Sequence, residues 1–432
     1  MDAVPSNGSE RRRGEDPARA SAFAELSARV DLEAAARAVA RDAVATPLIA
    51  SAELSERAGG AVLLKAESLQ VSGSFKLRGA LAKLAKLAAL GSLADDGLIA
   101  ASAGNHARAV AQAARIAGVA CEVFMPRDAP VSKVAAVERL GASVRLGAAT
   151  VEEAVELAAA RAGESGAALI HPFDDLDVIA GQGTLGLELL RDVPDLARVV
   201  VPVGGGGLAS GIGIALRRER PEVELIGVQA SACATLPQAL RDESAIAGVP
   251  ELPTAATIAD GIALKRPGEL TLPLLRELLA AVETVSEEQI ADAIVLLAER
   301  AKLVAEGAGA VSVAAIAAGR LAPIEGTTVA IVSGGNVDNG LLASLLRRHE
   351  TAAGRRVRAF TRVPDRPGAL AELLNLVAHA RANLVSLEHV REAVSLNVRE
   401  TGVELTLETR GREHTEELRR VLQDAGYEVT FE

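Results

Sequence analysis

Short apolar runs alternate with longer Ala-, Leu- and Arg-rich segments from residue 61 to about residue 331. The longer segments repeat apolar side chains at helical spacing, whereas the short runs are largely apolar on both faces. Strands of that kind are typical of parallel sheets covered by helices on both sides. The alternation therefore predicts an α/β fold. The expected strands are Ala61–Lys65, Gly97–Ala101, Cys121–Met125, Ser143–Leu146, Val199–Val203, Leu225–Val228 and Val329–Val332.

The length of 432 residues allows two or three domains with full cores. Residues 1–22 are polar and are predicted to form a disordered tail. A helix is expected from about Ser27 to Ala40. The main domain is expected over residues 23–346, followed by a polar linker at 347–355 and a second domain at 356–432.

Lys76 stands in a Gly/Ser/Phe-containing turn, Val71–Ala80, between the first expected strand and a helix beginning near Leu77. The chain has 46 Lys and Arg residues, of which only seven are lysines, so arginine supplies most of the positive charge. A desolvated lysine can lose its proton and attack a carbonyl, which arginine cannot do. Lys76 is therefore a candidate nucleophile, and the alternative is a solvated lysine in the first turn of a helix.

Three further loops that follow expected strands carry glycine: Ser102–Ala107, Gly204–Gly211 and Ser333–Asn336. In α/β sheets, ligands bind beyond the carboxyl ends of strands, at helix N-termini. The N–H groups of Gly204–Gly207 are suited to a phosphate. A glycine turn without a ligand remains an alternative. A dinucleotide site is disfavoured because Gln229 stands where an acid for the ribose is expected.

A lysine, a phosphate-binding loop, an Asn and a Ser on separate loops of one α/β unit favour pyridoxal phosphate as the cofactor. Lys76 is then expected to form the Schiff base, and Gly204–Gly207 to hold the phosphate. Asn105 is suited to hydrogen-bond the phenolic oxygen of the ring, and Ser333 to meet the pyridine nitrogen.

Eight segments in chain order resemble the threonine ammonia-lyases (threonine dehydratases). They are Ser72–Ala80, Ala101–Ala107, Ile170–Asp175, Ile179–Thr184, Pro202–Leu208, Ala259–Ala263, Glu306–Ala310 and Ser333–Asn336. The resemblance runs from about Thr46 to Asn339. It implies a fold-type II pyridoxal-phosphate-dependent unit, similar to tryptophan synthase β, with two subdomains and the cofactor in the cleft between them.

The resemblance also implies roles for individual residues. Lys76 is the catalytic residue, and Phe75 packs against the cofactor. The cofactor-binding set carried over is Lys76, Phe75, Asn105, Gly204, Gly205, Gly206, Gly207, Leu208 and Ser333. The loop expected to bind the substrate carboxylate consists of Ser102, Ala103, Gly104, Asn105 and His106.

The implied reaction is the β-elimination of water from L-threonine, which yields 2-oxobutanoate and ammonia, with Lys76 removing the α-proton. An L-serine ammonia-lyase and an amino-acid sensor built on an inactive scaffold are the alternatives. Racemisation is disfavoured because Ala103 stands where the similar serine racemases carry a serine. No metal site is expected, since the loop at residues 228–235 has no carboxylate and the six histidines lack ligand spacing.

The second domain follows a βαββαβ pattern, which predicts a ferredoxin-like fold and resembles a single ACT domain. The resemblance suggests isoleucine or valine as an effector, with Asp365, Arg366 and Gly368 as candidate contacts. A dimerisation module without a ligand is the alternative.

The net charge of −11 and the aromatic content of 2% disfavour nucleic acid and anionic membranes as partners. No apolar run is long enough to span a bilayer. Cys121 and Cys233 form no disulfide framework, so a cytoplasmic setting is expected. We expect a small amino acid as the substrate, a role in isoleucine biosynthesis, and a homo-oligomer, either a dimer or a tetramer.

Overall fold

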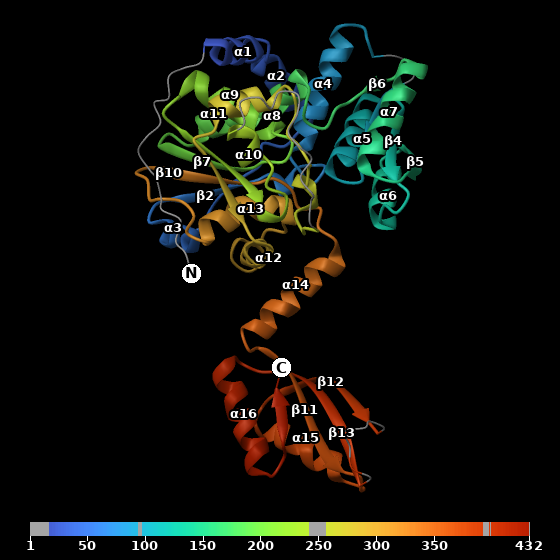
Figure 1. Ribbon diagram of the computed structural model, residues 1–432, viewed down its shortest axis with the longest axis vertical. Helices are drawn as coiled ribbons and strands as arrows, with labels where there is room; N and C mark the ends of the chain where they lie inside the picture. Colours follow the sequence, from blue (N-terminus) through green and yellow to red (C-terminus); the bar gives the residue numbers. More distant parts are fainter. Residues whose placement is uncertain (1–16, 94–96, 242–255, 392–396, 398, 432) are drawn as a thin grey trace. The chain divides into compact units, whose positions relative to one another are not determined.

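The computed structural model describes residues 17–93, 97–241, 256–391, 397 and 399–431. The chain divides into two compact units, Met1–Val337 and Asp338–Glu432, and each is described by itself. Figure 1 shows the elements of both units.

The first unit contains two sheets. Its strands are β1 (Leu48–Ala50), β2 (Val62–Ala66), β3 (Leu98–Ala101), β4 (Cys121–Pro126), β5 (Ser143–Ala148), β6 (Ala168–Leu169), β7 (Leu196–Pro202), β8 (Glu224–Ala230), β9 (Ala281–Val285) and β10 (Thr327–Val332). Six of them form a sheet in the order β1-β2-β10-β7-β8-β9, and four form a sheet in the order β5-β4-β3-β6. All pairs are parallel except β1 with β2, so the parallel α/β prediction is confirmed.

Helices cover both sheets, and Figure 1 shows α5, α6 and α7 beside the four-stranded sheet. The α-helices are α1 (Pro17–Ala28), α2 (Leu32–Asp42), α3 (Ala52–Ala58), α4 (Lys76–Ala89), α5 (Asn105–Ala117), α6 (Val131–Glu138), α7 (Val151–Ser165), α8 (Leu176–Asp192), α9 (Gly207–Glu219), α10 (Leu236–Arg241), α11 (Thr271–Leu278), α12 (Glu287–Leu296) and α13 (Gly307–Ala317). Short 3₁₀ turns lie at η1 (Glu67–Leu69), η2 (Ser231–Cys233) and η3 (Asp260–Ile262), and a π-helical turn at η4 (Leu297–Ala301).

The amino-terminal expectations need two corrections. Residues 1–16 of the expected tail lie outside the described residues, but residues 17–22 belong to α1, so disorder is wrong for them. The single helix expected from Ser27 to Ala40 is two helices. The reason is Asp31, whose carboxylate accepts a hydrogen bond of 2.9 Å from the N–H of Ala34 and starts α2.

The order of the strands places the glycine-bearing loops. Strands β2, β10 and β7 are adjacent and parallel, so the loops after them leave the same edge of the six-stranded sheet. The loop with Asn105 follows β3 of the four-stranded sheet. Every side chain of β10 is buried, which fixes the strand that precedes Ser333.

The second unit begins with α14 (Asn339–Ala352), which covers part of the expected linker at 347–355. The elements that follow are β11 (Arg356–Pro364), α15 (Ala369–His379), β12 (Asn383–Val390), β13 (Glu400–Glu408), α16 (Arg412–Asp424) and β14 (Val429–Phe431). The antiparallel order β12-β13-β11-β14 is that of a ferredoxin-like fold, as predicted. None of the helices in the described part of the chain is long and apolar enough to cross a membrane.

Candidate active site

Lys76 is the first residue of α4. Its Nζ atom donates a hydrogen bond of 2.7 Å to the carbonyl oxygen of Pro172 and lies 5.2 Å from the centre of the Phe75 ring. Burial lowers the pKa of Lys76 to about 8, and the negative charge of Glu306 opposes this shift. The positive end of the helix dipole also disfavours the ammonium form. The lysine can therefore lose its proton close to neutral pH.

The loop before α8 places Lys76 next to the glycine loop. Its residue Pro172 accepts the hydrogen bond from Lys76, and the next residue, Phe173, packs against Gly205 and Gly207. A Cβ atom at Gly205 would lie 2.3 Å from the Phe173 ring, and one at Gly207 would lie 2.8 Å from the Phe173 carbonyl oxygen. Glycine is therefore required at both positions by close packing.

The glycine loop connects β7 to the start of α9. Gly206 has a φ of 95°, a conformation that favours glycine. The hydroxyl of Thr271 donates a hydrogen bond of 2.5 Å to the carbonyl oxygen of Gly205 and holds that peptide unit. In the described chain, no N–H group of Gly204–Gly206 donates to a backbone oxygen. The loop therefore offers converging donors at a helix N-terminus, as an anion requires.

Asn105, at the start of α5, connects elements of the two sheets. Its Nδ2 donates to the carboxylate of Glu306 at the start of α13. Its Oδ1 accepts a hydrogen bond of 2.6 Å from Nδ2 of Asn336, which also donates to the carbonyl oxygen of Ser72 at 3.0 Å. Both ends of the Asn105 amide are therefore fixed in orientation beside the lysine loop.

Ser333 lies at the end of β10 and is 3% exposed. Its hydroxyl is 3.4 Å from the carbonyl oxygen of Ala308, and its own carbonyl oxygen accepts a hydrogen bond of 3.1 Å from the N–H of Phe75. The backbone thus ties Ser333 to the residue before Lys76. A second backbone bond, 2.9 Å from Gly335 N to Gly73 O, supports the same contact.

The loop expected to bind the substrate carboxylate is ordered by its own contacts. The hydroxyl of Ser102 accepts a hydrogen bond of 3.0 Å from the N–H of Gly104. His106 donates through Nε2 to the carbonyl oxygen of Ile170 at 2.7 Å, and burial lowers its pKa to about 3. The ring is therefore neutral, and that nitrogen is engaged within the protein. A direct role of His106 toward the substrate stays a prediction.

Glu306 lies in one of the eight similar segments, but the sequence predicted no role for its side chain. It is 7% exposed. Burial raises its pKa to about 7, with a further rise from the charge of Asp260, while the hydrogen bond from Asn105 opposes the shift. Asn336 and Phe173 also lie in such segments, and the sequence predicted no role for either. The missing information was three-dimensional, because each acts through a contact with a distant loop.

The residues present fit pyridoxal phosphate. The N–H groups of Gly204–Gly206 donate to no backbone oxygen of the described residues, and these N–H groups form the glycine cradle. A fully buried hydroxyl, Ser74 Oγ, has no hydrogen-bond partner among the described residues. An amine with a lowered pKa lies beside that cradle. A phosphate-binding loop, a spare hydroxyl donor and a deprotonatable lysine are the groups that hold this cofactor.

A family model described as pyridoxal-phosphate dependent enzyme matches residues 39–334. The chain belongs to this family. The pyridoxal phosphate cofactor and the fold-type II prediction are thereby confirmed.

Individual members of the family are similar over most of the chain. The L-threonine ammonia-lyase of Thermotoga maritima is 46% identical over 402 residues, which cover 92% of this chain and 98% of that protein. The crystal structure of a threonine deaminase from T.th. has a TM-score of 0.65 and 41% identity, covering 71% of this chain and 97% of that one. The structure of maize serine racemase has a TM-score of 0.66 and 32% identity, and the match covers 74% of this chain and 98% of that one.

The segment at residues 228–235, expected as a loop, consists of the last three residues of β8, the turn η2 and two further residues, and it has no carboxylate. Its buried Gln229 donates to the carbonyl oxygen of Val203 at 3.1 Å and accepts from the N–H of Leu236 at 2.9 Å. Gln229, which lies in β8, therefore connects the end of this strand to Val203 and to the start of α10. Within the described ranges, no group of three or more His, Cys, Asp or Glu side chains is arranged to hold a metal ion.

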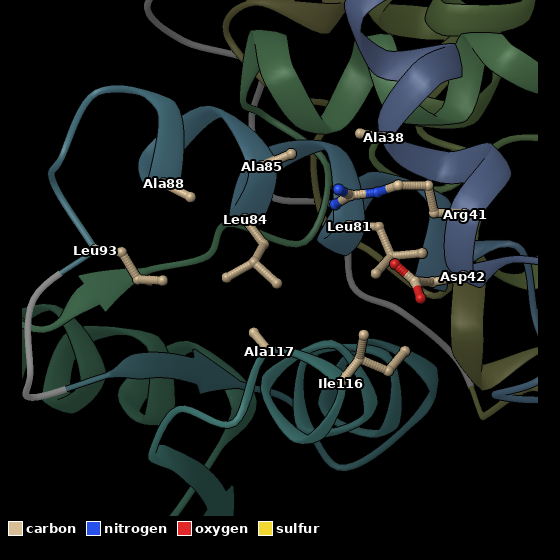
Figure 2. Close-up of a pocket in the computed structure, with 10 residues that line it drawn as sticks. All are labelled: Ala38, Arg41, Asp42, Leu81, Leu84, Ala85, Ala88, Leu93, Ile116 and Ala117. Carbon is tan, nitrogen blue, oxygen red and sulfur yellow. The ribbon is translucent and has the colours of Figure 1, made fainter.

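A separate hollow of about 390 Å³ lies between α2, α4 and α5 (Figure 2). Apolar side chains such as Leu84 and Ile116 face it, and Arg41 and Asp42 lie at one edge. None of its ten lining residues belongs to the glycine-bearing loops. It is therefore separate from the loops around Lys76.

The candidate effector residues lie between β11 and α15 of the second unit. Arg366 pairs with Glu372 at 2.8 Å, and Asp365 lies 3.5 Å from a guanidinium nitrogen of Arg391. Gly368 has a φ of 91° and precedes α15. These residues occupy one exposed turn, and their binding of an effector stays a prediction.

Proposed function

We propose that the protein is a threonine ammonia-lyase, which converts L-threonine to 2-oxobutanoate and ammonia. The observation that carries the proposal is the end-to-end similarity to the L-threonine ammonia-lyase of Thermotoga maritima. The arrangement around Lys76 supports it, because a buried amine with a lowered pKa is suited to remove a proton from an α-carbon.

The bound cofactor supplies an electron-withdrawing ring that stabilises negative charge on the α-carbon. Lys76 would accept the α-proton at Nζ, and Asn105, which is held by Glu306, would orient the ring of the bound cofactor. The N–H groups of Gly204–Gly207 would hold the phosphate at the start of α9. Ser333 offers a neutral hydroxyl to the ring nitrogen. A ring nitrogen that meets a neutral hydroxyl stays unprotonated, so the ring would withdraw electrons less strongly than a protonated one and would favour elimination over transamination.

Substrate binding is assigned to Ser102–His106, whose backbone N–H groups and side chains would receive the carboxylate. The methyl group of Ala103 has no proton to give to the opposite face of the α-carbon. We therefore propose elimination without racemisation, although maize serine racemase shares the fold.

The second unit is proposed to be an ACT-type regulatory module that binds isoleucine or valine at Asp365, Arg366 and Gly368. Its ferredoxin-like topology supports this assignment. Control by either amino acid would suit an enzyme of isoleucine biosynthesis. A homo-oligomer, either a dimer or a tetramer, and a cytoplasmic setting are part of the same proposal.

The test is a steady-state assay of the purified protein with pyridoxal phosphate. Formation of 2-oxobutanoate from L-threonine is compared with formation of pyruvate and D-serine from L-serine. We expect kcat/KM to be higher for threonine than for serine, and no D-serine. Preference for serine would make the enzyme an L-serine ammonia-lyase, and no keto acid from either would leave an amino-acid sensor.

A further inference from the structure

Glu306 connects three elements around the lysine. It precedes α13, and its backbone N–H donates to the carbonyl oxygen of Gly334 at 3.1 Å. Its carboxylate accepts from Asn105, the first residue of α5. A Cβ atom at Gly334 would lie 2.4 Å from its Oε1, so the space beside the carboxylate exists only because this residue is glycine. Glu306 is thus built into a closely fitted position.

We propose that Glu306 is a positioning residue with two separable tasks. Its side chain is long enough for the carboxylate to hold the Asn105 amide beside the lysine loop, and its negative charge sets how readily Lys76 gives up its proton. The inference deepens the proposed function, and it rests on the role proposed there for Lys76.

The charges around the pair give the direction of each effect. Glu306 is the charge that raises the pKa of Lys76 against the effect of burial. Besides Lys76 itself, charged groups from three other elements act on Glu306: Asp260 of η3 raises its pKa, whereas Lys133 of α6 and Arg108 of α5 lower it. Asp260 and Lys133 are themselves paired at 2.8 Å. Those two charges therefore offset each other near Glu306.

The hydrogen bonds give the positioning task. Asn105 uses Nδ2 toward Glu306 and Oδ1 toward Asn336. Loss of the Glu306 acceptor would leave the Nδ2 group free to turn. Asn105 begins α5, which packs against the four-stranded sheet, and Glu306 precedes α13, which packs against the six-stranded sheet. The hydrogen bond between them therefore also links the two sheets of the first unit near the lysine loop.

Two substitutions separate the tasks. Glu306→Gln keeps the length and an acceptor oxygen but removes the charge. Glu306→Asp keeps the charge but shortens the reach by one methylene group. Glu283→Gln is the matched control, because Glu283 in β9 is another partly buried carboxyl whose pKa is raised by burial, and it belongs to none of the loops described.

The experiment mixes each apoprotein with pyridoxal phosphate over a range of pH. The visible absorption of the lysine-bound cofactor gives the rate of its formation and the dissociation constant. The amine reacts only after its ammonium proton has passed to solvent, and one water leaves per bond formed, so the pH midpoint of the rate reports Lys76. Wild type is expected to have its midpoint near pH 8.

Glu306→Gln should lower that midpoint by about one pH unit, because the opposing charge is gone, and change the dissociation constant less than about threefold. Glu306→Asp should leave the midpoint near the wild-type value and raise the dissociation constant about tenfold. Glu283→Gln should match wild type in both. An unchanged midpoint in Glu306→Gln, or an equal change in Glu283→Gln, overturns the inference about Glu306 and leaves the proposed function in place. Absence of the absorption band in wild type overturns the proposed function as well.

A second measurement needs no cofactor. Because burial raises the Glu306 pKa from 4.5 to about 7, the folded state binds a proton between those values that the unfolded state does not. The stability of wild type should therefore fall relative to Glu306→Gln as pH rises from 4.5 to 7. A constant difference across this range would show that the carboxyl of Glu306 titrates outside it and is charged throughout.

Discussion

The guanidinium of Arg78 donates to both carboxylate oxygens of Glu67, at 2.8 and 2.9 Å, and both side chains are 0% exposed. Arg78 also reaches Glu188 at 2.6 Å, and Glu188 pairs with the buried Lys65 at 2.5 Å. Arg78 lies two residues beyond Lys76 in α4, whereas Glu188 lies in α8. The buried charges thus tie the lysine-bearing helix to the helix that follows Pro172.

Replacement of Arg78 by methionine should lower the free energy of unfolding by about 3–5 kcal/mol, because Glu67 would stay buried without its cation. Chemical unfolding monitored by circular dichroism measures this loss. Arg57→Met is the control, since Arg57 and Glu53 form an exposed pair of the kind that contributes about 0–1 kcal/mol. The double variant Glu67→Gln/Arg78→Met should be more stable than Arg78→Met. An equal or lower stability would show that lost packing, and not the unpaired charge, causes the effect.

Replacement of Lys76 by alanine should abolish the visible absorption of the lysine-bound cofactor and the formation of keto acid. The reason is that Lys76 is the lysine that lies next to the Gly204–Gly207 loop, through Pro172 and Phe173. Absorbance titration with pyridoxal phosphate, followed by borohydride reduction and peptide mapping, measures this. Lys86→Ala, an exposed lysine later in α4, should behave as wild type. Labelling of any residue other than Lys76 in wild type would refute the assignment.

The lowered pKa of Lys76 also predicts how stability depends on pH. In the unfolded apoprotein this lysine titrates near 10.5, and in the folded protein near 8, because burial disfavours its charge. Between these values the unfolded state binds more protons, so the stability of wild type should rise with pH relative to Lys76→Met. Urea unfolding from pH 7.5 to 10.5 tests this. Parallel stability curves for the two proteins would place the pKa of Lys76 at its ordinary value.

The positions of the loops that carry the candidate site residues could be predicted from the sequence. Lys76, Asn105, the run Gly204–Gly207 and Ser333 each follow a strongly apolar strand, and a parallel sheet brings such loops together. The strands themselves were predicted within a few residues wherever both faces are buried. The ferredoxin-like order of the second unit followed from its alternating pattern.

The remainder depends on tertiary contacts. Strands β1 and β6 have only three and two residues, and β9 lies at a sheet edge with partly exposed side chains, so none has a clear apolar run. The contacts of Glu306 and Phe173 join residues far apart in the chain. The cluster of ion pairs around Arg78 could not be predicted from the sequence either, because a charge is buried only where its partners lie, and sequence spacing does not show those partners.

Replacement of Gly205 by alanine should weaken cofactor binding by about tenfold or more, because the new Cβ atom would lie 2.3 Å from the Phe173 ring and displace it or the loop. Fluorescence titration of the apoprotein with pyridoxal phosphate measures the dissociation constant. Gly163→Ala is the control, since its added methyl group meets no atom within 4 Å in α7. The double variant Gly205→Ala/Phe173→Ala should recover part of the affinity. No recovery would mean that the N–H geometry of the loop, not the ring, sets the loss.

Replacement of Asp365 by alanine or of Gly368 by valine should abolish the response to isoleucine or valine and spare the basal turnover. Gly368 has a φ of 91°, so a β-branched residue strains the turn although no atom lies within 4 Å of the added Cβ position. Inhibition curves with threonine as substrate measure the response, and Glu416→Ala in α16 is the exposed control. Because these residues and the Lys76 loops belong to different compact units, basal kcat and KM should be unchanged. Inhibition that persists in both variants would assign the effector site elsewhere, and wild type that responds to neither amino acid would leave the second unit as a dimerisation module.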